Sequence, residues 1–251
     1  MTEQHGSPTA GRQGLRRFLQ PAAGGPPGGS GGVGPSIEPA GPGTSPYPPH
    51  GAVAPGPAPG QAEETCELCA ARVGPGHSHV ADLERSTLVC ACRACYLLFT
   101  GPGAGRGRYR AVPDRYLHDP GRPLTAAEWA ELDVPVGLAF FLNSSLLGRV
   151  CGFYPSPAGA TECTLDLEAW ARLGQGHPLL SMPEADVEAV LVSRTDDDIE
   201  CFLVPIDACY ELAGRMRMLW QGFDGGAEAR QSIAEFLDSV RSRARDLAPE
   251  P

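Results

Sequence analysis

Cys66-Glu-Leu-Cys69 and Cys92-Arg-Ala-Cys95 form two C-x2-C pairs, with 22 residues between them. Each pair predicts a tight turn that directs two sulfur atoms at one ion, and the intervening residues bring the second turn back to the first. The separation is slightly longer than in most zinc sites of this type, but the spacing within each pair is the usual one. The sequence therefore predicts a metal site whose ligands are Cys66, Cys69, Cys92 and Cys95.

Two neighbouring residues are alternative ligands. Cys90 lies two residues before Cys92 and would share its side of a strand, and His79 lies in the loop between the pairs. Either could substitute for one of the four cysteines. Zn²⁺ is the first expectation for the metal, because four thiolates suit a closed structural site. Iron, as a single ion or as an iron–sulfur cluster, is the alternative.

The residues around the pairs predict a small metal module over 63–112. Alternating apolar residues predict strands at 79–84 and 87–91, joined by a hairpin turn, and a short helix is expected at 96–99 after the second pair. This order is typical of a zinc ribbon or a rubredoxin-like module. The Gly- and Arg-rich residues 101–110 read as a flexible connector.

On the N-terminal side, residues 1–62 hold 15 of the 32 glycines and 13 of the 26 prolines. Such a segment cannot bury enough apolar surface to offset its ordering entropy, and we expect it to be a disordered tail. It carries no apolar stretch of an export signal, and no run in the chain is long enough to span a bilayer. The sequence predicts a cytoplasmic protein with reduced cysteines.

On the C-terminal side, residues 113–251 predict an α+β domain. Thr125 and Glu128 form a capping box, and Asp166 and Asp207 are each expected to cap a helix. The predicted strands pair as hairpins and imply an antiparallel sheet, while a Pro/Gly-rich loop is expected at 154–162. The strands are expected at 136–143, 148–154, 187–193 and 199–204, and the last helix after Gly225-Gly226.

Charge and composition argue against two classes of function, nucleic-acid binding and catalysis. From residue 63 onward the chain has 17 Arg against 28 Asp and Glu, a net charge of −11, which disfavours binding to nucleic acid. Cys151, Cys201 and Cys209 lie in apolar patterns and read as core thiols. His118 and His177 stand beside prolines and suggest surface loops, so no catalytic set is evident and the expected protein is not an enzyme. The remaining candidates for an enzymatic role are Cys209 and Glu162.

Several segments together resemble a known family. They are Cys66-Glu-Leu-Cys69, Leu88-Val-Cys90-Ala-Cys92-Arg-Ala-Cys95-Tyr-Leu-Leu-Phe99, Gly107-Arg-Tyr-Arg-Ala-Val-Pro-Asp-Arg115, Val136-Gly-Leu-Ala-Phe-Phe141, Tyr154-Pro-Ser-Pro-Ala-Gly-Ala-Thr-Glu162 and Val204-Pro-Ile-Asp-Ala-Cys-Tyr-Glu211. They resemble an actinobacterial family of unknown function encoded beside [NiFe]-hydrogenase structural and maturation genes. The resemblance covers about residues 63–245 and assigns no catalytic residues.

The resemblance implies an accessory role around a metalloenzyme, with a hydrogenase subunit or a maturation factor as the protein partner. Together with the cysteine pairs, it favours a non-enzymatic metal-binding adaptor. The alternative is a rubredoxin-like or iron–sulfur electron-transfer protein that uses the same cysteines.

Overall fold

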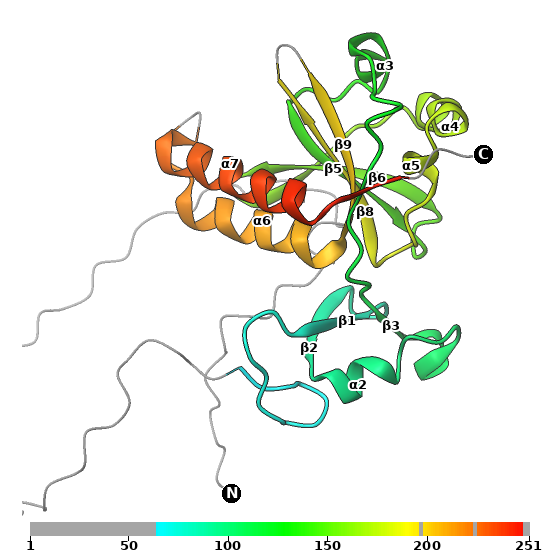
Figure 1. Cartoon of the computed structure of the whole chain (residues 1–251), viewed down its shortest axis with the longest axis vertical. Coiled ribbons are helices and arrows are strands. Elements are labelled where there is room, and N and C mark those ends of the chain that lie inside the picture. Colours follow the sequence, from blue (N-terminus) through cyan, green and yellow to red (C-terminus); the bar gives the residue numbers. More distant parts are fainter. Residues whose placement is uncertain (1–63, 196–197, 223–224, 248–251) are drawn as a thin grey trace, which may run out of the picture. The chain divides into compact units, whose positions relative to one another are not determined.

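The computed structural model describes residues 64–195, 198–222 and 225–247 (Figure 1). The tail predicted over residues 1–62 lies outside this part of the chain. The described residues form an α+β structure with two sheets, and none of their helices is long and apolar enough to cross a membrane.

The cysteine-rich segment forms a three-stranded antiparallel sheet of order β2-β1-β3, which we call the ribbon together with α2. The hairpin predicted here is confirmed, with His79 paired to Cys90 across β1 and β2. The flexible connector predicted at 101–110 was wrong in part, because its end enters β3 and adds the third strand. The bounds are β1 Ser78–Asp82, β2 Thr87–Ala91, α2 Arg93–Leu97, η1 Ala104–Gly107 and β3 Tyr109–Ala111.

The larger sheet has seven strands in the order β10-β4-β9-β8-β5-β6-β7. All pairs are antiparallel except β10 with β4, so the sheet is mixed where an antiparallel one was expected. The strands are β4 Leu117–His118, β5 Leu138–Ser144, β6 Arg149–Ser156, β7 Gly159–Cys163, β8 Glu188–Arg194, β9 Ile199–Pro205 and β10 Arg245–Asp246.

Helices cover both faces of this sheet, and alternate residues of each central strand enter separate apolar clusters. On β5, Phe140 and Leu142 join the cluster beneath α6 and α7, whereas Ala139 and Phe141 join the cluster beneath α3, α4 and α5 (Figure 1). The helices are α3 Ala126–Glu131, α4 Leu167–Gly176, α5 Pro178–Ser181, α6 Ile206–Leu219 and α7 Gly226–Arg243.

Two predicted helix caps are present. The Thr125 side chain accepts from the backbone N–H of Glu128, whose carboxylate accepts from the backbone N–H of Thr125 in return, and Asp166 caps α4. The cap predicted at Asp207 was wrong: the N-cap of α6 is Pro205, two residues earlier, and Asp207 lies in the first turn with its carboxylate directed at the ribbon.

The loop predicted at 154–162 was also wrong, because β6 continues to Ser156 and β7 starts at Gly159. Pro155 is tolerated because the pairing of β5 with β6 reaches only Phe153, so no neighbouring strand on that side needs its N–H. The reversal is instead confined to residues 157–158, and Gly159 has a φ of 105° that favours glycine.

The ribbon shares its apolar interior with the larger sheet. Ala81 of β1 and Val112, just after β3, belong to the same buried cluster as Ile206 and Ala208 of α6. Directly after this junction, Arg115 forms an ion pair with Glu188, a fully buried carboxylate on β8. These contacts hold β1 and the residues after β3 against the larger sheet and α6.

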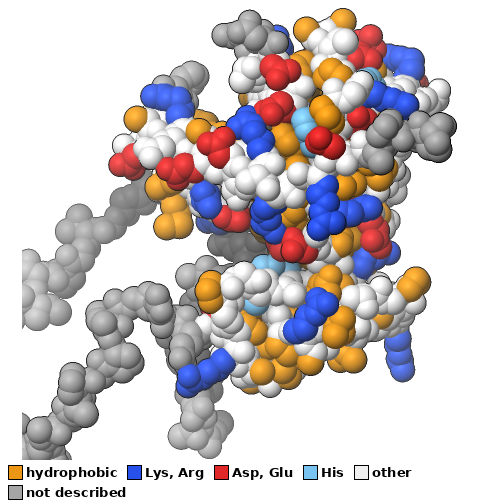
Figure 2. All heavy atoms as spheres, in the orientation of Figure 1, with side chains coloured by type: hydrophobic (Ala, Val, Ile, Leu, Met, Phe, Trp, Pro, Cys, Tyr) orange, Lys and Arg blue, Asp and Glu red, His pale blue; other side chains and the backbone are white. Residues whose placement is uncertain are grey.

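Hydrophobic side chains are exposed on the ribbon's outer side (Figure 2). Leu68 is 38% exposed, and Leu97 and Leu98 at the end of α2 are 52% and 68% exposed. Leu68 lies inside the first cysteine pair and the other two follow the second pair after Tyr96, so all three are close to the cysteines in the sequence.

Candidate metal centre

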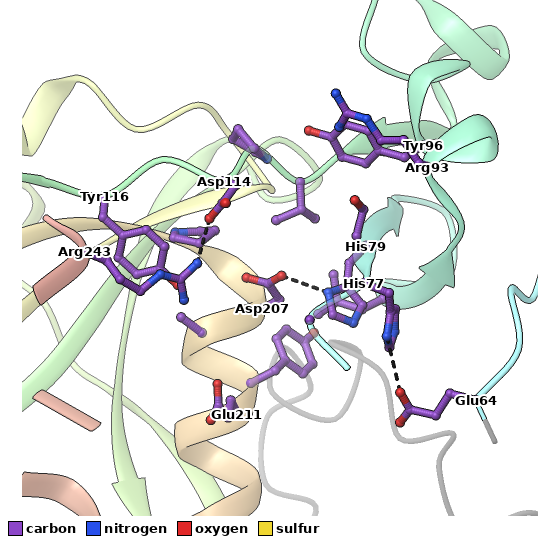
Figure 3. A pocket seen from close by; sticks show the side chains of 18 residues that line it. Glu64, His77, His79, Arg93, Tyr96, Asp114, Tyr116, Asp207, Glu211 and Arg243 are labelled. Atoms are coloured by element: carbon purple, nitrogen blue, oxygen red, sulfur yellow. Dashed lines mark hydrogen bonds and ion pairs between the residues drawn. The ribbon is translucent and has the colours of Figure 1, made fainter. Parts of the chain in front are cut away.

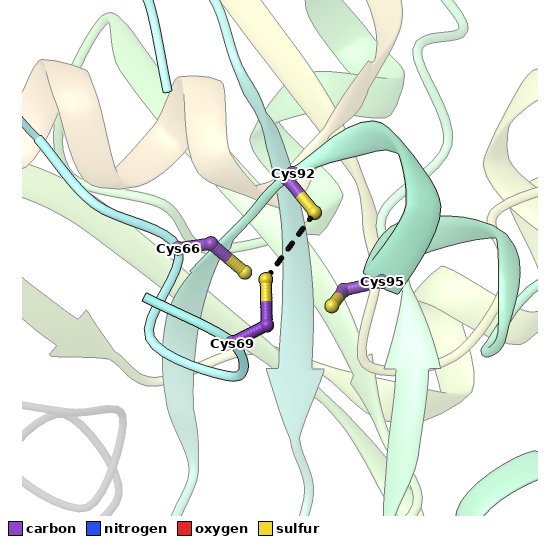
Figure 4. A group of neighbouring side chains, drawn as sticks. All are labelled: Cys66, Cys69, Cys92 and Cys95. Carbon is purple, nitrogen blue, oxygen red and sulfur yellow. Dashed lines mark hydrogen bonds between the residues drawn. The ribbon is translucent and has the colours of Figure 1, made fainter. Parts of the chain in front are cut away.

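The four cysteines of the two pairs converge at one end of the ribbon (Figure 4). Cys66 and Cys69 lie on a turn that is closed by the bond from Ala70 N–H to Cys66 O, at 2.8 Å, and Ala70 has a φ of 60°. Cys92 is the N-cap of α2, and Cys95 lies within that helix. The four sulfur atoms all lie within 4.8 Å of one another, which brings together the residues that the sequence predicted.

The spacing of the sulfurs matches a single tetrahedral ion. A metal with bonds of about 2.3 Å to four thiolates places neighbouring sulfurs about 3.8 Å apart. The sulfurs of Cys69 and Cys92 are 3.7 Å apart. Cys66 is buried, Cys92 and Cys95 are half-buried and Cys69 is exposed, so the centre lies at the surface of the ribbon.

The pKa values of the four thiols indicate that a bound cation would stabilise the site. Burial would raise the pKa of Cys66, but the backbone N–H groups of Cys92, Leu68 and Cys69 lower it to about 6. The hydrogen bond with Cys69 and the neighbouring thiolate charge raise the pKa of Cys95 to about 12. Four thiolates so close together repel one another, and a divalent ion such as zinc or iron would remove that conflict.

The two alternative ligands lie in a second group of side chains. His79 and Cys90 face each other across β1 and β2, and their ligand atoms lie within 4.8 Å of those of His77. His77 was not singled out from the sequence. The usable signal was the His-x-His spacing at the start of a strand, which places both rings on the side that faces Cys90.

His79 connects this group to α6. Its Nδ1 lies 2.8 Å from a carboxylate oxygen of Asp207. Burial lowers the pKa of His79, but the hydrogen bond to Asp207 and a further one to Cys90 outweigh burial and raise it to about 9. His77 and His79 line one wall of a pocket of about 590 Å³, which also includes Asp207, Tyr96 and Arg243 (Figure 3).

The other candidate residues lie elsewhere. Cys151, Cys201 and Cys209 are buried, as predicted, and burial raises the pKa of each thiol. Glu162 is paired with Arg149 on the edge hairpin, apart from both groups.

Surface loops were predicted for the two remaining histidines, and this is wrong for His118 and wrong in part for His177, which lies in the connection between α4 and α5 but is not on the surface. His118 is in β4 and stacks on Phe202. His177 is largely buried and bonds to Glu128 at 2.9 Å.

The fold and the site together define an α+β protein with a four-cysteine ribbon built onto its core. The model of the family of unknown function DUF5947 matches residues 65–244, and the chain belongs to that family. A search of curated proteins and a search of solved structures each found no significant match.

Proposed function

We propose that this protein is a non-enzymatic metal-binding accessory protein whose four cysteines hold one structural Zn²⁺. The observation that supports it best is the sulfur tetrahedron, with all four atoms within 4.8 Å of one another. In an iron–sulfur cluster the four terminal thiolates are divided between two or four iron atoms, and thiolates on different iron atoms lie further apart than the edge of one tetrahedron. The geometry therefore favours a single ion over a cluster.

Zinc is favoured over a single iron because the site would have a structural role: it would stabilise a ribbon with a small core. The buried hydrophobic residues within 64–111 are few: Cys66, Val80, Ala81, Ala91 and Ala111. So small a core cannot hold the two cysteine turns, whereas a structural zinc contributes about 10–16 kcal/mol in small metal domains. A rubredoxin-like electron carrier with one iron is the alternative, because the same tetrahedron accepts iron.

We further propose that the ribbon docks on a protein partner through Leu68, Leu97 and Leu98. Exposed apolar side chains grouped around a rigid metal turn are typical of interaction surfaces. The resemblance to the hydrogenase-associated family suggests a [NiFe]-hydrogenase subunit or a maturation factor as the partner. All nine cysteines are free thiols, which fits a cytoplasmic location.

Elemental analysis and a visible spectrum of protein purified anaerobically from its native host test the metal. One or more equivalents of zinc and no colour are expected. Stoichiometric iron with charge-transfer bands would instead indicate that the site transfers electrons and that its role is not structural. Cys69→Ser together with Cys95→Ser is expected to lose the ion of the four-cysteine site, because two of its four ligands are removed.

The docking surface is tested by calorimetric titration with purified hydrogenase subunits and maturation factors. Leu98→Glu is expected to weaken binding about tenfold or more, because it places a charge in an apolar contact. Leu146→Glu is the matched control, since Leu146 is 65% exposed on the β5–β6 turn and Leu98 is 68% exposed. If both variants lose the same binding affinity, Leu68, Leu97 and Leu98 do not form the docking surface. If the unchanged protein does not bind, the proposed partner is wrong.

A further inference from the structure

His77, His79 and Cys90 form a group of ligands that is separate from the four cysteines. His79 and Cys90 are directly paired across β1 and β2, so their side chains leave the sheet on the same side. His77 precedes β1 by one residue, and its ring centroid lies 4.8 Å from that of His79. One ligand atom from each residue lies within 4.8 Å of the other two.

Hydrogen bonds fix which ring nitrogens are available. Nδ1 of His79 lies 2.8 Å from Asp207, and Nδ1 of His77 lies 3.1 Å from the carbonyl of Gly74 and 3.2 Å from Glu64 (Figure 3). A carbonyl and a carboxylate only accept, so Nδ1 of each ring donates, and Nε2 is the nitrogen that a metal ion can bind once it carries no proton.

One of these two Nε2 atoms has no hydrogen-bond partner in the part of the chain that the structure describes. Nε2 of His77 is buried and makes no hydrogen bond there. Leaving a buried polar atom unsatisfied costs about 1–3 kcal/mol, and such an atom needs an explanation. A metal ion between the rings and the Cys90 thiolate would satisfy it.

We propose that His77, His79 and Cys90 bind a second divalent transition-metal ion, of the borderline class to which Zn²⁺ and Co²⁺ belong. Two imidazoles and one thiolate suit these ions, and a tetrahedral ion with bonds of about 2.0–2.3 Å places its ligands about 3.3–3.8 Å apart. The ligand atoms of the present group, all within 4.8 Å of one another, would move closer by up to about 1–1.5 Å to reach that spacing.

Three protein ligands leave a fourth position on the ion. His77 and His79 line the pocket of about 590 Å³, and we expect the fourth ligand, water or a small molecule, to come from that pocket. This arrangement is the one found in open metal sites, in contrast to the closed four-cysteine site.

Asp207 is the positioning residue of this second site. A carboxylate that accepts from the far nitrogen of a ligating histidine fixes the ring and makes it a better ligand. Because Asp207 lies on α6, the second ion would couple the ribbon to the larger sheet. Asp207→Asn is expected to weaken Zn²⁺ binding at the second site about 10–100-fold and to leave the four-cysteine site unchanged.

The test counts Zn²⁺ bound to the full chain after metal removal, reduction and reloading. Two groups of ligands predict two ions per chain. His77→Gln and Cys90→Ser are each expected to lose one ion and keep the other. His118→Gln and Cys163→Ser are the matched controls, because both residues are half-buried and outside the two groups, and they should keep both ions.

The four-cysteine variant Cys69→Ser/Cys95→Ser separates this site from the first. It should still bind one Co²⁺ with a weak thiolate charge-transfer band, because only Cys90 supplies sulfur. Unchanged protein that binds a single ion, or a His77→Gln variant that keeps two, would overturn the proposal.

A second measurement does not depend on how the variants fold. X-ray absorption at the zinc edge of the unchanged, reloaded protein should show a mixed shell of nitrogen and sulfur. A shell of sulfur alone would refute the second site while leaving the four-cysteine centre intact.

Discussion

Replacing Arg115 by Met should destabilise the protein strongly, because it leaves a buried charge without its partner. The carboxylate of Glu188 has no exposed surface and accepts from Arg115 Nε at 2.7 Å and from Nη2 at 2.5 Å. The only other donor recorded for it among the described residues is the backbone N–H of Glu184, at 2.9 Å. Methionine keeps most of the apolar stem but donates no hydrogen bond.

The expected loss in the free energy of unfolding is about 3 kcal/mol. Removing one partner of a buried ion pair costs about 3–5 kcal/mol. The lower end applies here, because Arg115 is 41% exposed and the Glu184 N–H remains. Arg172→Met is the matched control: its ion pair with Glu131 is 2.7 Å long, but the two side chains are 61% and 47% exposed. Such a surface pair contributes about 0–1 kcal/mol.

Guanidinium unfolding of the zinc-loaded protein, followed by the fluorescence of its three tryptophans, measures both losses. The double variant Arg115→Met/Glu188→Gln should recover part of the loss, because it removes the buried charge as well as its partner. If Arg115→Met costs no more than Arg172→Met, or if the double variant recovers nothing, the buried-charge explanation is wrong.

Three further outcomes are expected. The hydrogen bond from His177 lowers the pKa of Glu128 to about 2 from an ordinary 4.5, so its contribution to stability is complete above pH 4.5 and is lost as the pH falls toward 2. Over that range, acid should destabilise the unchanged protein more than Glu128→Gln in thermal unfolding. Gly159→Ala should cost about 1–3 kcal/mol, because φ is 105° and the added methyl would lie 2.6 Å from an Arg217 side-chain carbon. Chelation of the metal should speed hydrogen exchange in the ribbon and leave the seven-stranded sheet protected, because only the ribbon depends on the ion.

Each outcome has a control. Gly214 lies in α6 with open space around it, so Gly214→Ala should be neutral or stabilising by about 0.5–1 kcal/mol. If it loses as much stability as Gly159→Ala, strain at position 159 is not the cause of that loss. If the unchanged protein and Glu128→Gln lose the same stability in acid, the pKa of Glu128 is not lowered in the folded protein. Loss of protection throughout the sheet on chelation would show that the ion holds the whole fold.

The sequence correctly predicted those elements that depend on the spacing of residues within a short segment. The hairpin of β1 and β2, the capping box at Thr125 and the four converging cysteines all depend on spacings within a short segment. The identity of the metal is not encoded in those spacings, because zinc and iron accept the same four thiolates.

The failures have one physical cause, which is that contacts distant in the sequence override local preference. Pro155 suggested a loop, yet β6 continues through it because its pairing with β5 stops at Phe153 and only β7 pairs beyond that point. Strands of two or three residues, such as β3, β4 and β10, are too short to show a period. Asp207 looked like a cap, but its partner is His79, 128 residues earlier in the chain.

The shared interior of the ribbon and α6 limits how this metal module can be reused. A zinc ribbon that folds by itself can be transplanted, duplicated or deleted as a cassette during evolution or by an engineer. Here Ala81 and Val112 are covered by the larger sheet's own helix, so an excised ribbon would expose them to water. The ribbon and the sheet must therefore be inherited together, and fusions should join the chain before residue 64 instead of between the two.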